Sequence, residues 1–318
     1  MQPLISIQNL EKRYRDCEAL AGVSLEVPPG VVFALLGENG AGKTTMIKCL
    51  TGFEQPTAGS AKILGLDCHR DALEIRRRIG YVSDQPALYD WMRIDEIGWF
   101  TAAFYPTGYL KRYHELIAHY ELPVGRKIRQ LSKGQRAKVA LSLAIAHDPD
   151  LLILDEPTSG LDPVVRRHFL ESMVDRAAVG KTVFLSSHQI NEVERVADHV
   201  ALMKQGRLIH CEALESLKAK TRELQINVTD TGIPVPLVAA NVISADRTGR
   251  QWRLLVRDVS EAQLAQINGS DYVTQVIVHE PSLEEIFVGY IGCERPVAPE
   301  DAGASPSQME QDSPEVMS

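Results

Sequence analysis

The sequence predicts an α/β protein whose main sheet is mostly parallel, followed by a smaller, separate domain. Between residues 31 and 197, three short apolar runs suited to buried strands alternate with segments typical of helices. Such alternation is typical of parallel strands whose connecting helices cover both faces of the sheet. Beyond about Lys220 the pattern changes to short alternating segments between Gly and Asp turns, which predicts a second fold over residues 221–292.

The predicted elements follow in order along the chain. Residues 4–36 are strand-like and end in the apolar run Val31–Leu36, after which comes a glycine-rich loop and a helix over Thr44–Leu50. An aromatic-rich stretch and the helix after it predict an inserted helical subdomain over about 86–147. Further on we expect two more buried strands and a helix: Leu151–Leu154, Thr182–Leu185 and about Asn191–Ala197.

Composition and charge describe an ordinary globular protein without a nucleic-acid signal. The chain has 318 residues, a net charge of −8 and 44% hydrophobic residues. Six acids and one arginine from Cys293 onward give the tail a charge of −5, which leaves −3 for residues 1–292. Without a basic stripe, nucleic acid is not expected as a partner. The tail, residues 293–318, is rich in Pro, Ser and acids, which predicts disorder.

The cysteines and the N-terminus indicate a cytosolic chain. Five scattered cysteines, an odd number without metal-site spacing, are typical of a reducing compartment. The first residues alternate apolar and polar side chains, and no secretory signal is expected there. Because no apolar run approaches the roughly 20 residues of a spanning helix, we expect any membrane role to depend on a partner.

The glycine-rich loop has the chemistry of a phosphate cradle. Residues 37–45 match the pattern G-x-x-x-x-G-K-[ST] between a predicted strand and a predicted helix. Backbone N–H groups and the helix N-terminus suit phosphate oxygens, while Lys43 would reach the β and γ phosphates and the Thr44 hydroxyl would ligate Mg²⁺. The expected nucleotide-binding residues of this loop are Gly37, Asn39, Gly40, Ala41, Gly42, Lys43, Thr44 and Thr45.

Two adjacent acids follow the second apolar strand. Asp155 and Glu156 end the run Leu151–Leu154, which places them at the carboxyl edge of the sheet, where sites of α/β proteins lie. We assign Asp155 to Mg²⁺, through coordinated water, and Glu156 to polarising the water that attacks the γ-phosphate. An Asp-Glu pair that merely caps the turn is the alternative, which the phosphate loop in the same chain disfavours.

Further motifs, taken together, resemble the ABC ATPase family. They are Leu131-Ser132-Lys133-Gly134-Gln135, Ser159-Gly160-Leu161-Asp162 and Ser186-Ser187-His188, and they stand in the family's order around the carboxylates. The resemblance covers about residues 4–209. It implies a phosphate-loop NTPase cassette with a mostly parallel core sheet, an antiparallel β subdomain and an inserted helical subdomain, followed here by a small α+β domain.

The resemblance also implies roles for single residues in binding and hydrolysing ATP. Tyr14 is similar to the aromatic that stacks on adenine, and His188 to the switch histidine that touches the γ-phosphate. Ser132, Gly134 and Gln135 resemble the signature loop, which in the family contacts the nucleotide held by the opposite protomer, and Asp162 resembles the residue that couples the two sites. We therefore expect Lys43, Glu156 and His188 to be the catalytic residues. Taken singly, Tyr14 would equally suit an aromatic of an edge strand, Ser132 a helix N-cap and His188 a hydrogen-bonded strand end.

Two positions depart from the family's pattern. Lys133 occupies a usual glycine position of the signature and adds a cation near the partner's nucleotide. In the stretch Ile79–Pro86, the glutamine that reports on the metal and water aligns by spacing with Asp84, and with Gln85 only after a slip of one residue. We favour Asp84 as an additional metal-associated residue, with Gln85 as the alternative.

The segments after Asp162 and near residue 285 indicate which branch of the ABC ATPase family the sequence resembles. Leu-Asp-Pro-Val-Val-Arg and Ser282–Phe287 resemble the type-2 exporters, with YtrB-like and drug-export ATPases the most similar. The resemblance implies a homodimer or heterodimer at the cytoplasmic face of the cell membrane, bound to an integral permease, with export as its direction. The aromatic stretch Tyr89–Phe100 would meet that permease, unless it only packs the subdomain core. The C-terminal domain suits either dimerisation or ligand sensing.

Two other interpretations use the same nucleotide chemistry. A soluble ABC ATPase acting on ribosomes or chromosomes would carry two cassettes or a long coiled coil, and the sequence has neither. A regulatory subunit that binds nucleotide without turnover is the other, and Glu156 and His188 disfavour it.

Overall fold

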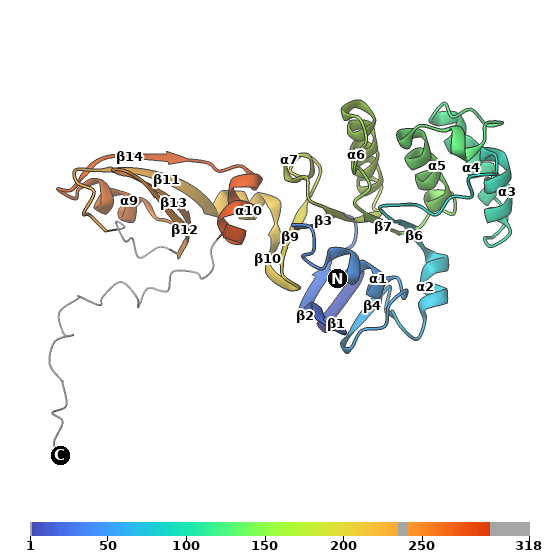
Figure 1. Cartoon of the computed structure of the whole chain (residues 1–318), viewed down its shortest axis with the longest axis horizontal. Coiled ribbons are helices and arrows are strands. Elements are labelled where there is room, and N and C mark those ends of the chain that lie inside the picture. Colours follow the sequence, from blue (N-terminus) through green and yellow to red (C-terminus); the bar gives the residue numbers. More distant parts are fainter. Residues whose placement is uncertain (1, 235–240, 293–318) are drawn as a thin grey trace, which may run out of the picture. The chain divides into compact units, whose positions relative to one another are not determined.

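The computed structural model describes residues 2–234 and 241–292, so the predicted tail lies outside the described residues. These residues form two compact units, one up to Leu217 and one from Lys218 onward. The first unit contains two sheets and a group of helices, and the second contains one sheet with two helices (Figure 1). Each unit is described by itself below.

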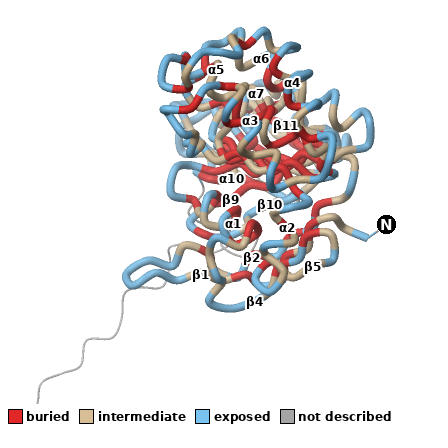
Figure 2. Tube along the Cα trace, turned by 90° about the vertical axis from the view of Figure 1, so that its right-hand side faces the viewer, coloured by how far each residue is buried: buried red, intermediate tan, exposed pale blue. Residues whose placement is uncertain are grey.

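The core sheet of the first unit is mostly parallel and has the strand order β10-β9-β3-β8-β7-β6. Only the β10–β9 pair is antiparallel among the paired strands of this sheet in the described residues. The strands β3, β7 and β8 are buried along their whole length, as the short apolar runs predicted. Figure 2 draws the buried residues of the chain in red. The six strands are β3 (Val32–Gly37), β6 (Ile79–Val82), β7 (Leu151–Asp155), β8 (Thr182–Ser187), β9 (His199–Lys204) and β10 (Arg207–Ala213).

A second, antiparallel sheet of the same unit has the order β2-β1-β4-β5. Its apolar side chains, among them Ile5, Ile7 and Leu20, share one core with Phe33 and with Met46 of α1. This packing holds the start of the phosphate loop between the two sheets. The strands are β1 (Ile5–Tyr14), β2 (Cys17–Val27), β4 (Ala58–Ile63) and β5 (Leu66–Asp67).

Three helices of the first unit pack together as a separate group. The helices α3, α4 and α5 enclose a separate apolar core that includes Tyr113, Ile117 and Val139 (Figure 1). The helices and a 3₁₀ turn are α1 (Lys43–Leu50), α2 (Ala72–Arg78), α3 (Ile94–Ala102), α4 (Tyr109–His119), η1 (Ile128–Gln130), α5 (Lys133–Ile145), α6 (Pro163–Ala178), α7 (Ile190–Val193) and α8 (Leu214–Lys220), the last of which spans the division between the units.

One predicted element is shorter than expected. The helix predicted over Asn191–Ala197 is α7, which ends at Val193 and continues as turns. The reason lies in the next strand, because Asp198 is held by the core sheet through both its backbone and its side chain. Its N–H donates to the Val32 carbonyl, and its carboxylate accepts from the Val32 N–H at 2.8 Å. The chain must therefore leave the helix to enter β9.

The second unit has a four-stranded antiparallel sheet in the order β12-β13-β11-β14. Alternate residues of β11 and β13, such as Leu224, Ile226 and Leu254, form a core with Ile267 of α9. This arrangement follows from the alternating segments that the sequence shows there. Its elements are β11 (Thr221–Val228), β12 (Asn241–Thr248), β13 (Gln251–Arg257), α9 (Glu261–Asn268), β14 (Val273–His279) and α10 (Leu283–Gly292).

The topology of the core sheet determines where the predicted site residues meet. The strands β3, β8 and β7 are parallel neighbours, so the loops that leave their carboxyl ends lie side by side. The phosphate loop follows β3, His188 follows β8, and Asp155 ends β7 with Glu156 after it. Three sequence-distant motifs are thereby brought to one edge.

Candidate functional site

The phosphate loop connects β3 to α1 and depends on glycines at two close approaches. Gly42 precedes α1 with φ +104°, a region that favours glycine, and a Cβ there would lie 2.5 Å from the Ala19 carbonyl oxygen. A Cβ at Gly37 would lie 2.7 Å from the carbonyl oxygen of Met203. Any larger residue at either position would push the loop away from the sheets, so the backbone cradle requires both glycines.

Lys43 is buried at the start of α1 and faces the loop that precedes it. Its ammonium donates to the carbonyls of Gly37 at 2.7 Å and Glu38 at 3.2 Å. The same nitrogen lies 3.1 Å from Glu156 Oε1. A cation in this position would meet the phosphates of a nucleotide that the loop holds.

Glu156 lies between two of the predicted catalytic residues. Its Oε1 faces Lys43, while its Oε2 is 2.7 Å from His188 Nδ1 and accepts from the His188 backbone N–H at 3.3 Å. The glutamate side chain is mostly buried, and that of His188 is about two-fifths exposed. The structure thus brings Lys43, Glu156 and His188 together. Glu156 Oε1 is buried and accepts no hydrogen bond from the described residues, although the Lys43 ammonium is close to it. A carboxylate oxygen without a hydrogen-bond partner can accept the proton of a water molecule.

Asp155 and Thr44 also meet at this edge of the sheet. The Thr44 hydroxyl donates to Asp155 Oδ1 at 3.2 Å, and Asp155 is only 2% exposed. A hydroxyl and a carboxylate are the hard oxygen ligands that Mg²⁺ prefers, so these residues fit the expected metal. On β6, burial and then the charge of Asp155 raise the pKa of Tyr81 to about 12.

One residue that sequence reasoning did not single out joins the two acids. Ser186 is fully buried at the end of β8 and pairs in register with Asp155. Its hydroxyl donates to Asp155 Oδ1 at 2.6 Å and accepts from the Glu156 N–H at 3.0 Å. The available signal is the pair of serines that ends the apolar run of β8, at the carboxyl edge of a parallel strand.

The remaining residues of the loop and Tyr14 differ in how far they are exposed. Ala41 is buried, Asn39, Gly40 and Thr44 are exposed, and Thr45 is partly buried. Tyr14, at the end of β1, is 42% exposed, and the Lys12 ammonium lies 4.9 Å from the centre of its ring. The other face of an exposed ring is suited to stacking on a planar base.

The predicted signature residues form a second group at the start of α5. Ser132 caps this helix, since its hydroxyl accepts from the Gln135 N–H at 3.2 Å while Gln135 Oε1 accepts from the Ser132 N–H at 3.0 Å. Gly134 is buried, and a Cβ there would lie 3.2 Å from Val165. Within the described part of the chain, no hydrogen bond or ion pair joins this group to residues 37–45.

Asp162 belongs to the same second group. Its carboxylate caps α6 by accepting from the Val165 N–H at 3.0 Å, and Val165 is the residue that Gly134 approaches. Lys133 extends over the neighbouring loop, where its ammonium would lie 2.4 Å from a Cβ at Gly160. The start of α5 and the loop before α6 therefore form one contiguous surface.

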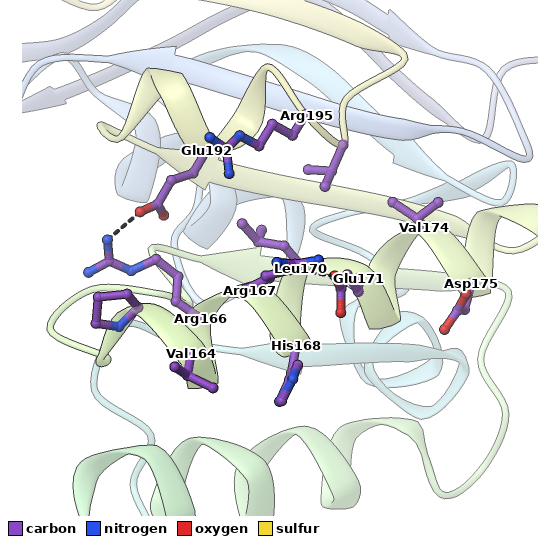
Figure 3. Close-up of a pocket in the computed structure, with 12 residues that line it drawn as sticks. Val164, Arg166, Arg167, His168, Leu170, Glu171, Val174, Asp175, Glu192 and Arg195 are labelled. Atoms are coloured by element: carbon purple, nitrogen blue, oxygen red, sulfur yellow. Dashed lines mark hydrogen bonds and ion pairs between the residues drawn. The ribbon is translucent and has the colours of Figure 1, made fainter.

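A groove of about 880 Å³ lies between α6 and α7, and its lining includes none of the predicted site residues (Figure 3). Across it, the Arg166 guanidinium pairs with the carboxylate of Glu192. Arg166 also donates to the Leu161 carbonyl at 2.9 Å. One arginine thus connects the loop that carries Asp162 with the helix that follows His188.

The two candidates for the additional metal-associated position lie together in the loop after β6. Asp84 and Gln85 are both exposed after β6 and line a cavity of about 380 Å³ together with Lys133 and Ser159. In residues 2–234 and 241–292, no hydrogen bond joins Asp84 to Thr44 or Asp155. The choice between the two positions stays a prediction.

The comparisons with known proteins agree with these motifs. Residues 20–159 match the family described as ABC transporter. The daunorubicin resistance ATP-binding protein DrrA3 of Streptomyces coeruleorubidus is 32% identical, over 92% of this chain and 97% of that one. The ABC transporter ATP-binding protein YtrB of Bacillus subtilis is 28% identical, over 92% of this chain and 99% of the other.

A solved structure gives the same result for the fold. The dimeric post-hydrolysis state of the ATP-binding cassette MJ0796, with ADP and phosphate bound, is 27% identical and has a TM-score of 0.62 over 66% of this chain and 98% of that one. The predicted cassette fold and the predicted resemblance to drug-resistance and YtrB-type proteins are therefore confirmed. The chain belongs to the ABC transporter family and is one of its ATP-binding proteins, an ATPase.

Proposed function

We propose that this ATPase dimerises around two ATP molecules and drives a separate membrane permease, with export as the direction of transport. The observation that carries the hydrolytic part is the Glu156 carboxylate, which lies between Lys43 at 3.1 Å and His188 at 2.7 Å. Such a carboxylate is an acceptor for the proton of an attacking water.

In the proposed reaction, Lys43 changes partners when ATP binds. The phosphate oxygens carry more negative charge than one carboxylate and lie at the loop, so they attract the Lys43 ammonium away from Glu156. Glu156 Oε1 then accepts a hydrogen bond from water. As the water oxygen bonds to the γ-phosphorus, the bond to the β-phosphate oxygen breaks and Glu156 takes the proton, which gives ADP and phosphate.

The other site residues orient this reaction. His188 holds Glu156 Oε2 through one ring nitrogen, which leaves the other nitrogen for the γ-phosphate. Tyr14 stacks on the adenine, and the N–H groups of the phosphate loop hold the phosphates. Thr44 and Asp155 would hold Mg²⁺, which neutralises phosphate charge when it is bound.

A second copy of the chain, or a related ATPase, would complete each site. In the described residues, no hydrogen bond joins the group formed by Ser132, Gly134, Gln135 and Asp162 to the phosphate loop of its own chain. The N-terminus of α5 nevertheless offers backbone amides and a hydroxyl, which suit a γ-phosphate. The dimeric state of the MJ0796 cassette, 27% identical, supports an arrangement in which a partner supplies this group.

A groove on the first unit supports a permease partner. It has a volume of about 700 Å³ and lies between the core and the helical group, with Phe53, Tyr81 and Tyr105 in its lining. The helical group also exposes large aromatics, and Trp99 is 71% exposed. Exposed apolar side chains of this size are typical of binding surfaces. None of the helices within residues 2–234 and 241–292 has the length and hydropathy of a membrane span.

The proposed direction and location follow from the relatives. DrrA3 is described as a daunorubicin resistance protein, and resistance is consistent with moving a compound outward. We therefore place the chain at the cytoplasmic face of the cell membrane, held there by the permease.

The test of hydrolysis compares Glu156→Gln with the unchanged protein. Because the amide cannot take a proton but keeps the shape, ATP should bind with unchanged affinity while turnover falls by a factor of about 100 or more. Binding is measured with a fluorescent ATP analogue and turnover as phosphate release. Near-normal turnover of Glu156→Gln would contradict the proposed role.

Dimerisation is measured on the same variant by light scattering. With ATP and Mg²⁺ the mass should double, and it should fall back when ATP is removed. Glu171→Gln is the matched control, because Glu171 lies on the exposed side of α6 and pairs with Arg167 of the same helix. A Glu156→Gln protein that stays monomeric at saturating ATP would contradict the two-chain site.

A further inference from the structure

Ser186 contacts both Asp155, the last residue of β7, and Glu156, the residue after it, and no role follows for it from the motifs themselves. We propose that Ser186 is a positioning residue for ATP hydrolysis, which fixes Asp155 and Glu156 relative to each other. The proposal rests on the functions proposed above for these two acids. It concerns a hydroxyl that is fully buried and contacts both residues.

The direction of both hydrogen bonds is determined by their partners. The backbone N–H of Glu156 can only donate, so Ser186 Oγ is the acceptor in the 3.0 Å contact. The single hydroxyl hydrogen is then available for Asp155 Oδ1, which lies 2.6 Å away. A bond this short between a hydroxyl and a carboxylate oxygen is typical of a charge-assisted hydrogen bond.

The bond to Asp155 selects which of its oxygens stays available. Oδ1 accepts from both Ser186 at 2.6 Å and Thr44 at 3.2 Å. Among the described residues, both side-chain hydrogen bonds of this carboxylate go to Oδ1. Oδ2 is therefore left for the metal or its coordinated water. Without Ser186, the carboxylate could rotate and exchange its two oxygens.

The bond to Glu156 supports an unusual backbone conformation. Glu156 has φ +49°, in the left-handed region that residues with a Cβ rarely adopt. Its N–H is shared between the hydroxyl of Ser186 and the Ser186 carbonyl oxygen, which lies 3.2 Å away. Ser186 thus supplies both acceptors of the Glu156 N–H. The direction of the Glu156 side chain toward Lys43 and His188 depends on that conformation.

Register explains why this position and no other has the role. Ser186 is the partner of Asp155 in the β7–β8 ladder, so its side chain is next to the last residue of β7. Its neighbour Ser187 faces elsewhere, since its hydroxyl accepts from the Gln189 N–H at 2.9 Å. A hydroxyl one residue earlier or later would not lie between the acids.

The experiment uses the full chain with Ser186→Ala and Ser186→Thr. We expect Ser186→Ala to lower kcat about 10-fold while the ATP affinity measured without Mg²⁺ stays unchanged. Ser186→Thr keeps the hydroxyl and should restore kcat to within about threefold. If denaturation shows that threonine does not fit, Ser186→Cys replaces it as the variant that retains a weaker donor.

A second readout does not depend on turnover. In the Glu156→Gln background, the affinity for a fluorescent ATP analogue is measured with and without Mg²⁺. The factor by which Mg²⁺ tightens binding should fall severalfold in Ser186→Ala, because Asp155 is no longer held in one orientation. The matched control is Thr182→Val, which removes another buried hydroxyl of β8 whose partner is the Gly30 N–H at 2.8 Å.

The outcomes separate this inference from the proposed function. If Ser186→Ala keeps the kcat and the Mg²⁺ factor of the unchanged protein while Glu156→Gln loses turnover, the positioning role is wrong and the function stands. If Ser186→Ala loses no more activity than Thr182→Val, the effect is one of stability, and the role is again wrong. If Glu156→Gln itself keeps turnover, the proposed function fails, and the Ser186 role fails with it.

Discussion

At the scale of the residue, the site depends on a small number of charged contacts between segments far apart in sequence. Lys43 begins α1 and Glu156 follows β7, yet the Lys43 ammonium and Glu156 Oε1 lie 3.1 Å apart. The pairing has a consequence for binding, because the lysine that would hold the phosphates is neutralised by the carboxylate until a nucleotide arrives. Substitutions at the two ends of the pair should therefore have different effects on affinity and turnover.

Lys43→Met should weaken ATP binding by about 30-fold, since a charge-assisted hydrogen bond is worth about 2 kcal/mol. Glu156→Gln should not weaken ATP binding, because the loss of the carboxylate charge leaves the Lys43 ammonium free for phosphate. Equilibrium titration with a fluorescent ATP analogue measures both variants. Equal affinity of Lys43→Met and the unchanged protein would show that the lysine does not reach the phosphates.

The sequence indicated the identity of these residues but not all of their contacts. The pattern around Lys43 and the acids after Leu154 were sufficient to predict a nucleotide site. Ser186 could not be found in this way, because its role depends on strand register, and register is set by the pairing of β7 with β8 rather than by local pattern. Asp84 and Gln85 show the same limit, since spacing alone does not determine where an exposed loop residue points.

At the scale of the element, close packing determines how the helical group is held together. Gly98 in α3 packs against Tyr113 in α4, and a Cβ at Gly98 would lie 2.1 Å from the tyrosine ring. That ring is fully buried, and its hydroxyl donates to the Ile94 carbonyl at 2.7 Å. The ring can therefore not move aside without losing a hydrogen bond.

Gly98→Ala should lower the free energy of unfolding by about 1–3 kcal/mol, the usual cost of overpacking a core. Urea denaturation followed by circular dichroism measures this change. Gly125→Ala is the control, because a Cβ at Gly125 would meet no heavy atom of the described residues within 4 Å. Equal stability of the two variants would contradict the close packing of α3 against α4.

A stacked histidine joins the helical group to the core sheet and makes the contact sensitive to pH. The centre of the His147 ring lies 4.4 Å from that of Tyr105, and its Nε2 is 3.2 Å from the Ile79 carbonyl oxygen of β6. Burial, which outweighs the hydrogen bond to Ile79, lowers the pKa of His147. The unfolded chain therefore binds a proton at a higher pH than the folded one does.

Stability should accordingly fall as the pH decreases through the ordinary histidine value of about 6.5, because only the unfolded state gains the proton there. His147→Phe keeps a ring for stacking and removes the titration. Between about pH 7.5 and pH 5.5, the unfolding free energy should fall less in His147→Phe than in the unchanged protein. An equal fall in the two proteins would show that His147 does not contribute.

The sequence predicted most elements from short-range pattern. Strands β3, β7 and β8 and helix α5 follow from apolar runs and caps that are local in sequence. The extent of α7 could not be predicted, because it is limited by the bonds of Asp198 to Val32, a residue 166 positions away. Tertiary hydrogen bonds thus overrule helix propensity at that point.

At the scale of the whole molecule, the chain combines a nucleotide-binding unit with a separate sheet domain. The first unit holds all the predicted site residues, and the second, from Lys218 onward, holds none of them. In the part of the chain that the structure describes, the two groups of site residues are linked through Arg166, which connects the loop of Asp162 with the helix after His188. No direct hydrogen bond joins the groups there, and a partner chain is the simplest way to bring both to one ATP.

The proposed permease partner rests on a surface of the same unit. The groove beside Phe53 and the exposed ring of Trp99 offer an apolar surface on the unit that binds ATP. Its occupant should be a membrane protein, because the proposed work is transport. The membrane partner, more than hydrolysis, therefore distinguishes a transporter subunit from other ATPases of the same fold.

The most direct test is affinity purification of tagged Glu156→Gln protein from its native membranes with ATP and Mg²⁺ present. Matched purification of the double variant Glu156→Gln, Trp99→Ala tests the surface. We predict that an integral membrane protein with several spanning segments is recovered in stoichiometric amount and that Trp99→Ala reduces its recovery. Recovery of ribosomes, of DNA-bound complexes or of the ATPase dimer alone would contradict a transporter role.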